Sequence, residues 1–493
     1  MKKGALFFIM AVSVVTLVFS QQVSWTVNNT ATWGEAVNRI RGGGNNKTYT
    51  ITVSGTIPIP ITPNNEITFG SVTGITVVIE GNGTISRSGG ATGSLLLIGT
   101  GQTVIVRNLT LHGGNISSVG IFRIEGNTAL LDCDVAIGGG TFTMLGDTSI
   151  SGTTTTTSEW WGTSNNRAVR VTGGTFTMQD NASISGSRGG GVSIGSNGTF
   201  IMRNNATISN NTSGSAAGVS CSGTFIMEGG TISGNIANGG YGDNQGGAGV
   251  SINGGSFTMR GGTISGNNDR SDGAMNSGGG GVRVASGTFT MLNNALITGN
   301  TSRNGGGGVY IGYDFSAGSG TFIMEGGTIS GNTSSRSGGG VSVAGNSSVS
   351  GGSASPRRMF TMKGGTISGN RANGNGGGVS LGSGNPISFS MESGIISGNT
   401  AGDRGGGVFG GNFTKTGGTI YGNDANPSNL GNRATSNRGH AIIAGGNWRN
   451  ATAGQGMNSG SYGFWLNEDN EEVVSPPSTP GQITPQPSRY VTF

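Results

Sequence analysis

Residues 256–267 read SFTMRGGTISGN, and close variants of this stretch recur along the chain. The clearest other copies lie at residues 224–235, 288–300, 321–332 and 360–370. Each copy is followed by a loop of variable length and then by GGGV or a close variant of it. Self-similarity of this kind is typical of repeat architectures, in which each repeat is one structural unit stacked on the next.

Apolar and polar residues alternate within each repeat, which predicts short β-strands. The Phe and Met of residues 257–259 share one face, while the threonine between them points the other way. The same alternation in the GGGV segments places pairs such as Val250 and Ile252 on one face. Three short strands per repeat, separated by glycine-rich corners, predict one coil of a parallel β-helix. We therefore expect an all-β fold, a single-stranded parallel β-helix or solenoid.

Other repeat folds do not fit the glycine content. Glycine makes up 102 of the 493 residues, and it is costly inside an α-helix. Its spacing also lacks the strict period of three that a collagen triple helix requires.

Stacked coils align equivalent residues roughly 4.8 Å apart, so the repeat predicts ladders of identical side chains. The expected Phe ladder contains Phe142, Phe176, Phe200, Phe225, Phe257, Phe289, Phe322, Phe360, Phe389 and Phe413. The expected Met ladder contains Met144, Met178, Met202, Met227, Met259, Met291, Met324, Met362 and Met391. The expected Asn ladder contains Asn235, Asn267, Asn300, Asn332, Asn370, Asn399 and Asn423. Asn in such a ladder satisfies buried turn amides and Met fills core gaps, so we assign these residues structural roles.

The N-terminus is typical of a cleavable export signal. Residues 1–20 contain Lys2 and Lys3, followed by an apolar stretch from Ala5 to Phe19 that is shorter than the roughly 20 residues needed to cross a bilayer. Its removal lowers the formal charge from +5 to +3, because 25 basic and 22 acidic residues remain. We expect an exported protein, located in the periplasm, on the cell surface or outside the cell, with no transmembrane segment in the mature chain.

The rest of the chain divides where the regularity of the repeat changes. Residues 32–35, TWGE, have capping-box spacing, and Ala36, Val37 and Ile40 line one face of an expected short capping helix. We expect one irregular strand to run from Val104 to Leu111. The expected segments are an N-terminal cap at residues 21–48, irregular coils at 49–140, regular repeats at 141–424, a C-terminal cap at 425–470 and a Pro-rich disordered tail at 471–493.

Cysteine and histidine are too sparse to indicate a disulfide, metal or cofactor site. Cys133 and Cys221 are expected to lie three or more coils apart, and Cys221 occupies an inward position that holds Val or Ile in other repeats. His112 and His440 are the only histidines and are far apart in sequence, which argues against a zinc site. We expect His112 at a solvent-facing turn, and we expect no cofactor and no bound metal.

Asp132 and Asp134 are the best candidates for catalysis. Hydrolysis of a glycosidic bond needs paired carboxylates that face a common groove. The two aspartates flank Cys133 on an expected strand, so they would share the face opposite to it. In the alternative interpretation Leu131, Cys133 and Val135 face the core and the aspartates simply face water. Acidic residues number only 22 in the whole chain, which disfavours an enzyme.

Two surface features indicate ligand binding. Arg188, Arg303, Arg336 and Arg404 each precede a glycine-rich GGGV segment, so they would rise along one corner as a basic stripe able to bind anionic glycans. The alternative is that they form salt bridges or only keep the protein soluble. Trp160 and Trp161 lie in a polar insertion, where they would either stack on sugar rings or fold back onto the β-helix.

The tandem motifs also carry a family resemblance. The pairing of GGGV with ISGN resembles the repeats of right-handed parallel β-helix proteins of bacterial surfaces. It is similar to the GGAI and FxxN repeats of polymorphic outer-membrane proteins and autotransporter passengers. The resemblance covers roughly residues 141–424, with weaker likeness from 50 to 140. It implies a right-handed β-helix. Fewer than thirty residues follow Leu466, so we do not expect the membrane barrel that ends an autotransporter.

Three function classes follow from these observations. The first is a secreted or surface-displayed adhesin-like protein that binds glycans or other host or cell-envelope molecules through its variable loops. The second is a polysaccharide lyase or glycoside hydrolase of the pectate-lyase-like fold. The third is an ice-binding protein, because outward Thr-x-Thr pairs such as Thr141 and Thr143 recur, although Ile201, Ile226 and Ile323 interrupt them. Charged residues make up 10% of the chain, which gives no electrostatic case for nucleic-acid binding.

Overall fold

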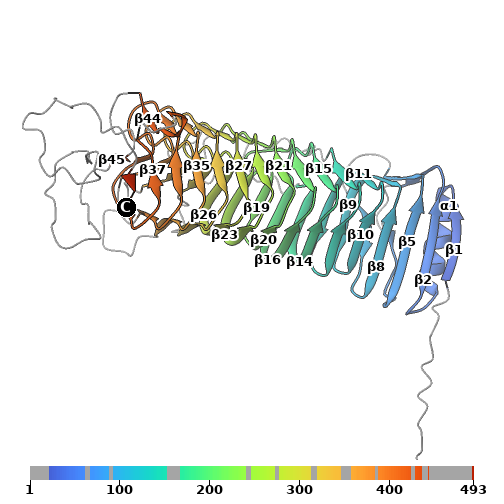
Figure 1. Cartoon of the computed structure of the whole chain (residues 1–493). Coiled ribbons are helices and arrows are strands. Elements are labelled where there is room, and N and C mark those ends of the chain that lie inside the picture. Colours follow the sequence, from blue (N-terminus) through green and yellow to red (C-terminus); the bar gives the residue numbers. More distant parts are fainter. Residues whose placement is uncertain are drawn as a thin grey trace, which may run out of the picture.

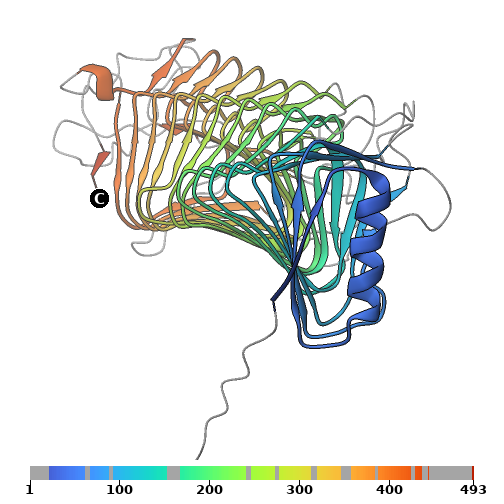
Figure 2. The ribbon, with the colours of Figure 1, turned by 90° about the vertical axis from the view of Figure 1, so that its right-hand side faces the viewer.

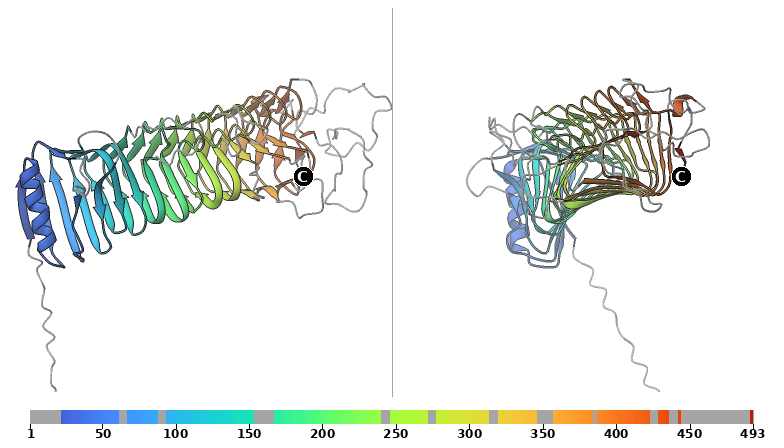
Figure 3. Two further views of the ribbon diagram at one scale, coloured as in Figure 1. Left: turned by 180° about the vertical axis from the view of Figure 1, so that it is seen from behind. Right: turned by 90° about the vertical axis from the view of Figure 1, so that its left-hand side faces the viewer.

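The structure is an elongated stack of parallel β-coils with one helix at its N-terminal end (Figure 1). This computed structural model describes residues 22–60, 67–87, 93–152, 167–239, 246–271, 277–312, 319–345, 357–383, 387–422, 428–435, 442–443 and 491–492. The expected all-β parallel β-helix is confirmed. Figure 3 shows the helix and the last coils at opposite ends of the stack.

Helix α1 (Thr30–Gly42) closes the first coil, as Figure 2 shows. Trp33, Ala36, Val37 and Ile40 are buried because they lie on the face of the helix that packs on the coils. The helix begins one turn earlier than the TWGE spacing predicted. Its capping box joins Asn29 to Thr32, whose backbone N–H donates to Asn29 Oδ1 at 3.0 Å.

Each coil has three main faces, which we name by their inward residues. The Phe face carries the TFTM strands. Its strands pair in parallel in the order β1 (Gln22–Val27), β2 (Thr48–Val53), β5 (Ile75–Gly81), β8 (Gln102–Arg107), β10 (Ile121–Glu125), β12 (Thr141–Met144), β14 (Val169–Met178), β16 (Val192–Met202), β20 (Thr224–Met227), β23 (Val250–Met259), β26 (Val282–Met291), β30 (Gly320–Met324), β34 (Arg358–Met362), β38 (Ile387–Met391) and β42 (Phe413–Lys415).

The Ile face carries the TIS strands, each with a buried central residue. Its order is β3 (Thr56–Ile59), β6 (Thr84–Arg87), β9 (Thr110–Ser118), β11 (Ala129–Ile137), β13 (Ser149–Ser151), β15 (Ser183–Ser185), β17 (Thr207–Ser209), β21 (Thr231–Ser233), β24 (Thr263–Ser265), β27 (Leu296–Thr298), β31 (Thr328–Ser330), β35 (Thr366–Ser368), β39 (Ile395–Ser397) and β43 (Thr419–Ile420). Strand β46 (Val491–Thr492) pairs antiparallel with β43, although it belongs to the segment that we expected to be a disordered tail.

The Val face carries the GVxV strands and shares several long strands with its neighbours. It consists of β4 (Ile67–Thr68), β7 (Ser94–Ile98), the second halves of β9 and β11, the first halves of β14, β16, β23 and β26, and the separate strands β19 (Val219–Cys221), β29 (Val309–Ile311), β33 (Val341–Val343), β37 (Val379–Leu381), β41 (Val408–Phe409) and β45 (Ile442–Ile443).

A second, 8-stranded sheet follows the Ile face in the chain and precedes the Val face. We call it the edge sheet. Its two-residue strands are β18 (Thr212–Ser213), β22 (Ile236–Ala237), β25 (Asn268–Asp269), β28 (Thr301–Ser302), β32 (Thr333–Ser334), β36 (Arg371–Ala372), β40 (Thr400–Ala401) and β44 (Arg433–Ala434). Strands β44 and β45 continue the stacking into the segment that we expected to be a C-terminal cap.

The predicted side-chain ladders form the core. Neighbouring Phe rings stack with centroids 4.5–4.9 Å apart, from Phe122 through every predicted member to Phe413. All predicted Met ladder members are buried, and Lys415 takes the next position after Met391. One expected strand was wrong, because Asn108 has a φ of 53° and bends the chain between β8 and β9.

The Asn ladder supplies hydrogen-bond partners for backbone groups at the corner that follows the Ile face. In each step Asn Nδ2 donates to the Oδ1 of the next Asn and to the carbonyl of an Ile-face residue. The ladder begins at Asn211 and ends at Asn432, which accepts from Asn399 at 2.9 Å. Our choice of Asn423 was therefore wrong. Asn423 lies outside the described residues, and a longer connection places Asn432 at the ladder position.

Candidate functional site

The two candidate catalytic aspartates do not share a face. Asp132 has a φ of 52° and occupies the corner that Gly152 and Gly186 take in the next two coils, also at positive φ. Its Oδ2 lies 3.5 Å from Nε2 of His112, which is in strand β9 and not in a turn. The corner interrupts the alternation of inward and outward side chains along β11. Leu130 and Cys133, three residues apart, are therefore buried, while Leu131 is 38% exposed. Our expectations for Leu131 and for a regular strand through Asp132 were therefore wrong.

Asp134 has the more unusual environment of the two. It lies opposite Asn115 in the neighbouring coil, and its Oδ1 is buried without a hydrogen-bond partner among the described residues. Burial raises the pKa of its carboxyl to about 6, although the positive charge of Arg170 opposes the rise. Asp134 could hold a proton near neutral pH, but no hydrogen bond or ion pair within the described residues links its carboxyl to a second carboxylate that could be its partner in hydrolysis.

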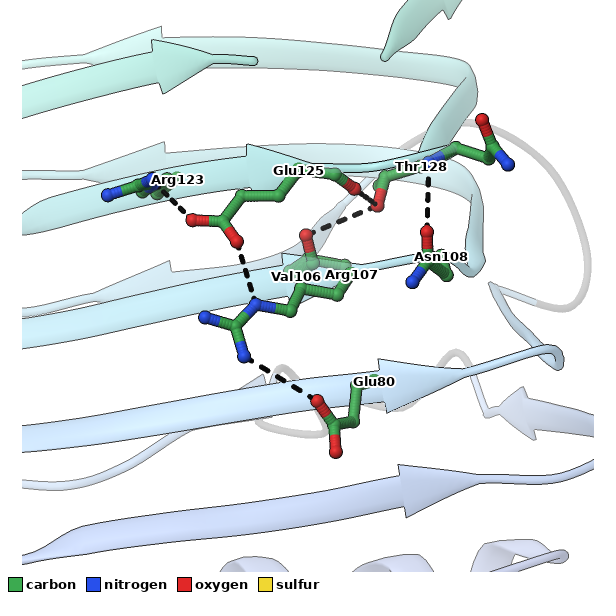
Figure 4. A network of polar contacts seen from close by, with 8 residues as sticks. Glu80, Val106, Arg107, Asn108, Arg123, Glu125 and Thr128 are labelled. Atoms are coloured by element: carbon green, nitrogen blue, oxygen red, sulfur yellow. Dashed lines mark hydrogen bonds and ion pairs between the residues drawn. The ribbon is translucent and has the colours of Figure 1, made fainter. Parts of the chain in front are cut away.

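The irregular coils carry a charged network that the sequence did not reveal (Figure 4). Glu80, Arg107 and Glu125 occupy the same register position on β5, β8 and β10, so opposite charges alternate along the stack. Arg107 Nε donates to Glu125 Oε2 at 2.7 Å, and its Nη1 lies 3.7 Å from Glu80 Oε2. Arg123 also pairs with Glu125. These acids and bases satisfy one another, which indicates a cross-link between coils worth about 1 kcal/mol or less per exposed pair.

The arginines of the predicted basic stripe lie near the edge sheet, but they do not share one register position. Arg303 follows the edge strand β28 directly, whereas Arg336 and Arg404 lie two and three residues after the ends of β32 and β40. Arg188 is exposed near the same edge, but the coils of β18 and β22 separate it from the others and place no arginine there.

The register brings in three arginines that sequence analysis missed. Arg270 directly follows β25 and aligns with Arg303, while Arg371 and Arg433 are the outward residues of β36 and β44. Six successive coils therefore each contribute one arginine within three residues of an edge strand. We call this set the basic edge; its members are Arg270, Arg303, Arg336, Arg371, Arg404 and Arg433. All six side chains are exposed except Arg404, which is half-buried.

Two acidic residues lie on the described part of the basic edge. Among the described residues of the six edge strands and the turns after them, the acids are Asp269 and Asp403. Asp269 is buried, accepts hydrogen bonds from Ser302 and Ser271, and has a raised carboxyl pKa because of that burial. Asp403 Oδ1 lies 3.6 Å from Arg404 Nε. The described residues of the edge therefore include more basic than acidic side chains, with about one coil spacing, roughly 4.8 Å, between contributing coils.

The remaining candidates add no site. Trp160, Trp161 and His440 lie outside the described residues, as does the expected export signal at residues 1–20. Cys133 and Cys221 are buried free thiols, and burial raises the pKa of each to about 12. The part of the chain that the structure describes contains no group of three or more His, Cys, Asp or Glu residues suited to a metal. None of its helices has the length and apolar character needed to cross a membrane.

Comparison with known proteins adds no evidence to this geometry. No protein-family model, curated protein or solved structure matches the chain.

Proposed function

We propose that this protein is an exported, surface-displayed β-helix scaffold with an adhesin-like role, whose basic edge binds anionic glycan chains. The single observation that carries the proposal is the presence of one arginine in each of six successive coils, on the same narrow edge. The resemblance of the GGGV and ISGN motifs to bacterial surface repeats and the signal-like residues 1–20 support the location.

Electrostatics favours a linear polyanion on this edge. Arg270 and Arg303 share one register position on adjacent coils, and two guanidinium groups 5 Å apart in water repel each other by about 0.8 kcal/mol. The other four arginines follow on the next coils, each offset along the edge by a few residues. An extended anionic polysaccharide would relieve this repulsion along its whole length. Binding should weaken as salt rises, because exposed charges are screened within a Debye length of about 10 Å at 0.1 M salt.

A matched pair of charge variants tests the proposal. Arg303, Arg336 and Arg371 are changed together to Gln, and the control changes Arg203, Arg260 and Lys363 to Gln at turns between the Phe and Ile faces. Affinities for polygalacturonate and for a heparin oligosaccharide are measured by calorimetry at low salt. At about 0.5 kcal/mol or more per lost contact, the edge variant should bind at least about tenfold more weakly, while the control binds like the wild type. Equal losses in both variants would show that only net charge matters and would refute the proposal.

A polysaccharide-cleaving enzyme is the second candidate, because the carboxyl of Asp134 can retain a proton near neutral pH. The test is release of reducing ends or unsaturated products from a panel of polysaccharides, with Asp134→Asn as the comparison. No release from any substrate would remove this candidate.

A further inference from the structure

A hollow of about 510 Å³ lies on the outer surface at the C-terminal end of the Ile face. We call it the Tyr421 hollow. Its floor is formed by β35 and β39, near the end of the face, and its walls by Tyr421, which follows β43, and by the 3-10 helix η1 (Ser428–Leu430). The lining residues that matter here are Ser368, Ile395, Ser397, Tyr421, Asn429 and Leu430.

The hollow forms where a row of aligned Ser and Thr residues on the Ile face ends in an aromatic residue. The third residue of each TIS strand is Ser or Thr along the whole regular stack. In register these are Ser151, Ser185, Ser209, Ser233, Ser265, Thr298, Ser330, Ser368 and Ser397. Because Ile396 pairs with Ile420, the next position in the row belongs to Tyr421, whose N–H donates to the carbonyl of Ile396 at 3.1 Å.

Helix η1 is held against the same corner by backbone and ladder contacts. The N–H of Gly398 donates to the carbonyl of Leu430 at 2.8 Å. A Cβ atom at Gly398 would lie only 2.7 Å from the carbonyl oxygen of Asn429, so this close approach needs a glycine. Asn432, the last member of the Asn ladder, donates to the carbonyl of Tyr421 at 2.7 Å. Contacts with Gly398 and Asn432, two residues at repeat positions, therefore hold both walls in place.

The lining combines an apolar surface with hydroxyl groups and carries no charged side chain. Ile395 is 39% exposed where most coils have Thr or Ser, and Leu430 and the Tyr421 ring extend this apolar surface. The hydroxyl of Ser368 makes no side-chain hydrogen bond with the described part of the chain, and Ser397, which is 4% exposed, also lines the hollow. Asn429 adds an exposed amide that can both donate and accept.

We infer that the Tyr421 hollow binds one ring of a neutral saccharide. A pyranose ring presents apolar C–H groups, which suit the Tyr and Ile surfaces, and hydroxyls at its rim, which suit Ser, Thr and Asn. The volume lies within the range of small-molecule sites, and the lack of charge favours an uncharged ligand. The inference does not depend on the basic edge, which uses other residues and a different ligand chemistry.

The repeat supplies a variant that should remove binding without disturbing the fold. Tyr421→Ser restores the residue type that eight other coils carry at this position, so the scaffold should keep its thermal unfolding midpoint. The matched control is Ser233→Ala, at the same row position on β21, several coils away from the hollow. The purified full chain and both variants are titrated with neutral hexasaccharides of glucose, mannose, galactose and N-acetylglucosamine, using calorimetry and saturation-transfer NMR.

At least one hexasaccharide should bind the wild type and the Ser233→Ala variant equally, and should bind Tyr421→Ser roughly tenfold more weakly or worse. Tyr421→Phe should keep most of the affinity, because it keeps the ring. Binding that survives in Tyr421→Ser would overturn the inference, as would the absence of binding to all four hexasaccharides. Loss of polyanion binding by the edge variant, with hexasaccharide binding intact, would leave this site standing by itself.

Discussion

Truncation of one Asn ladder member should destabilise its coil strongly. Asn300 is fully buried, and its side chain takes part in four hydrogen bonds. Its Oδ1 accepts from the backbone N–H of Asn267 at 3.0 Å and from the side-chain amide of Asn267 at 2.9 Å. Its Nδ2 donates to the carbonyl of Ile264 and to Oδ1 of Asn332, each at 2.9 Å.

The cost of Asn300→Ala follows from the groups that remain unpaired. Both donors of Asn267 and the carbonyl of Ile264 lose a partner, whereas Asn332 Oδ1 still accepts from the backbone N–H of residue 300. The backbone N–H of Asn267 is left unpaired at a cost of about 1–3 kcal/mol, whereas its side-chain amide keeps the bond to the carbonyl of Ile232. The two other lost bonds cost about 0.5–1.5 kcal/mol each, so the local free energy of opening should fall by about 2–6 kcal/mol. Asn373→Ala is the matched control, because Asn373 is exposed and its side chain makes no hydrogen bond within the described residues.

Hydrogen exchange measured by mass spectrometry is the appropriate assay, since a stack of coils can open locally rather than in one two-state step. Faster exchange should be confined to the coils on either side of residue 300 and should leave the N-terminal coils near α1 unchanged. A loss below about 1 kcal/mol, or one equal to that of Asn373→Ala, would refute a structural role for the ladder.

Two further outcomes are expected from burial. Asp134 binds a proton more readily in the folded state, with a pKa of about 6 against an ordinary value of 3.8, so stability should fall as pH rises through this window. Asp134→Asn should therefore be more stable than the wild type in urea unfolding at pH 7 and close to it at pH 4; an equal difference at both pH values would contradict this. Cys133 and Cys221 should resist iodoacetamide at pH 8 in the folded protein, because burial raises their thiol pKa values to about 12. In denaturant both should react, and labelling of the folded protein, followed by peptide mapping, would contradict their burial.

The sequence predicted the core because the core repeats. Phe257, Met259 and Ile264 recur at fixed spacing, and identical residues at fixed spacing must stack once the coil is closed. Features that depend on the unequal loops could not be predicted in the same way. The ladder position after Asn399 belongs to Asn432 and not to the predicted Asn423, because the connection from Ile420 to the ladder is longer than in the earlier coils.

The candidate sites were harder to predict for a related reason. The left-handed corner at Asp132 separates it from Asp134, and two-residue alternation does not reveal such a corner. Arg270, Arg371 and Arg433 do not stand directly before a GGGV segment, so only strand pairing places them on the basic edge. Tyr421 likewise stands out only when the rows of the Ile face are aligned.

Because the Asn, Phe and Ile ladders connect each coil only to its immediate neighbours, the number of coils is not fixed by the fold. Removing residues 263–295 would join Gly262 to Leu296, and Ile297 and Asn300 would then take the ladder positions of Ile264 and Asn267. Unequal recombination between such similar segments can therefore lengthen or shorten the molecule by whole coils while keeping every ladder in register. The length of the stack, measured from its helix-capped end, can therefore change in steps of one coil without changing how the remaining coils pack on their neighbours.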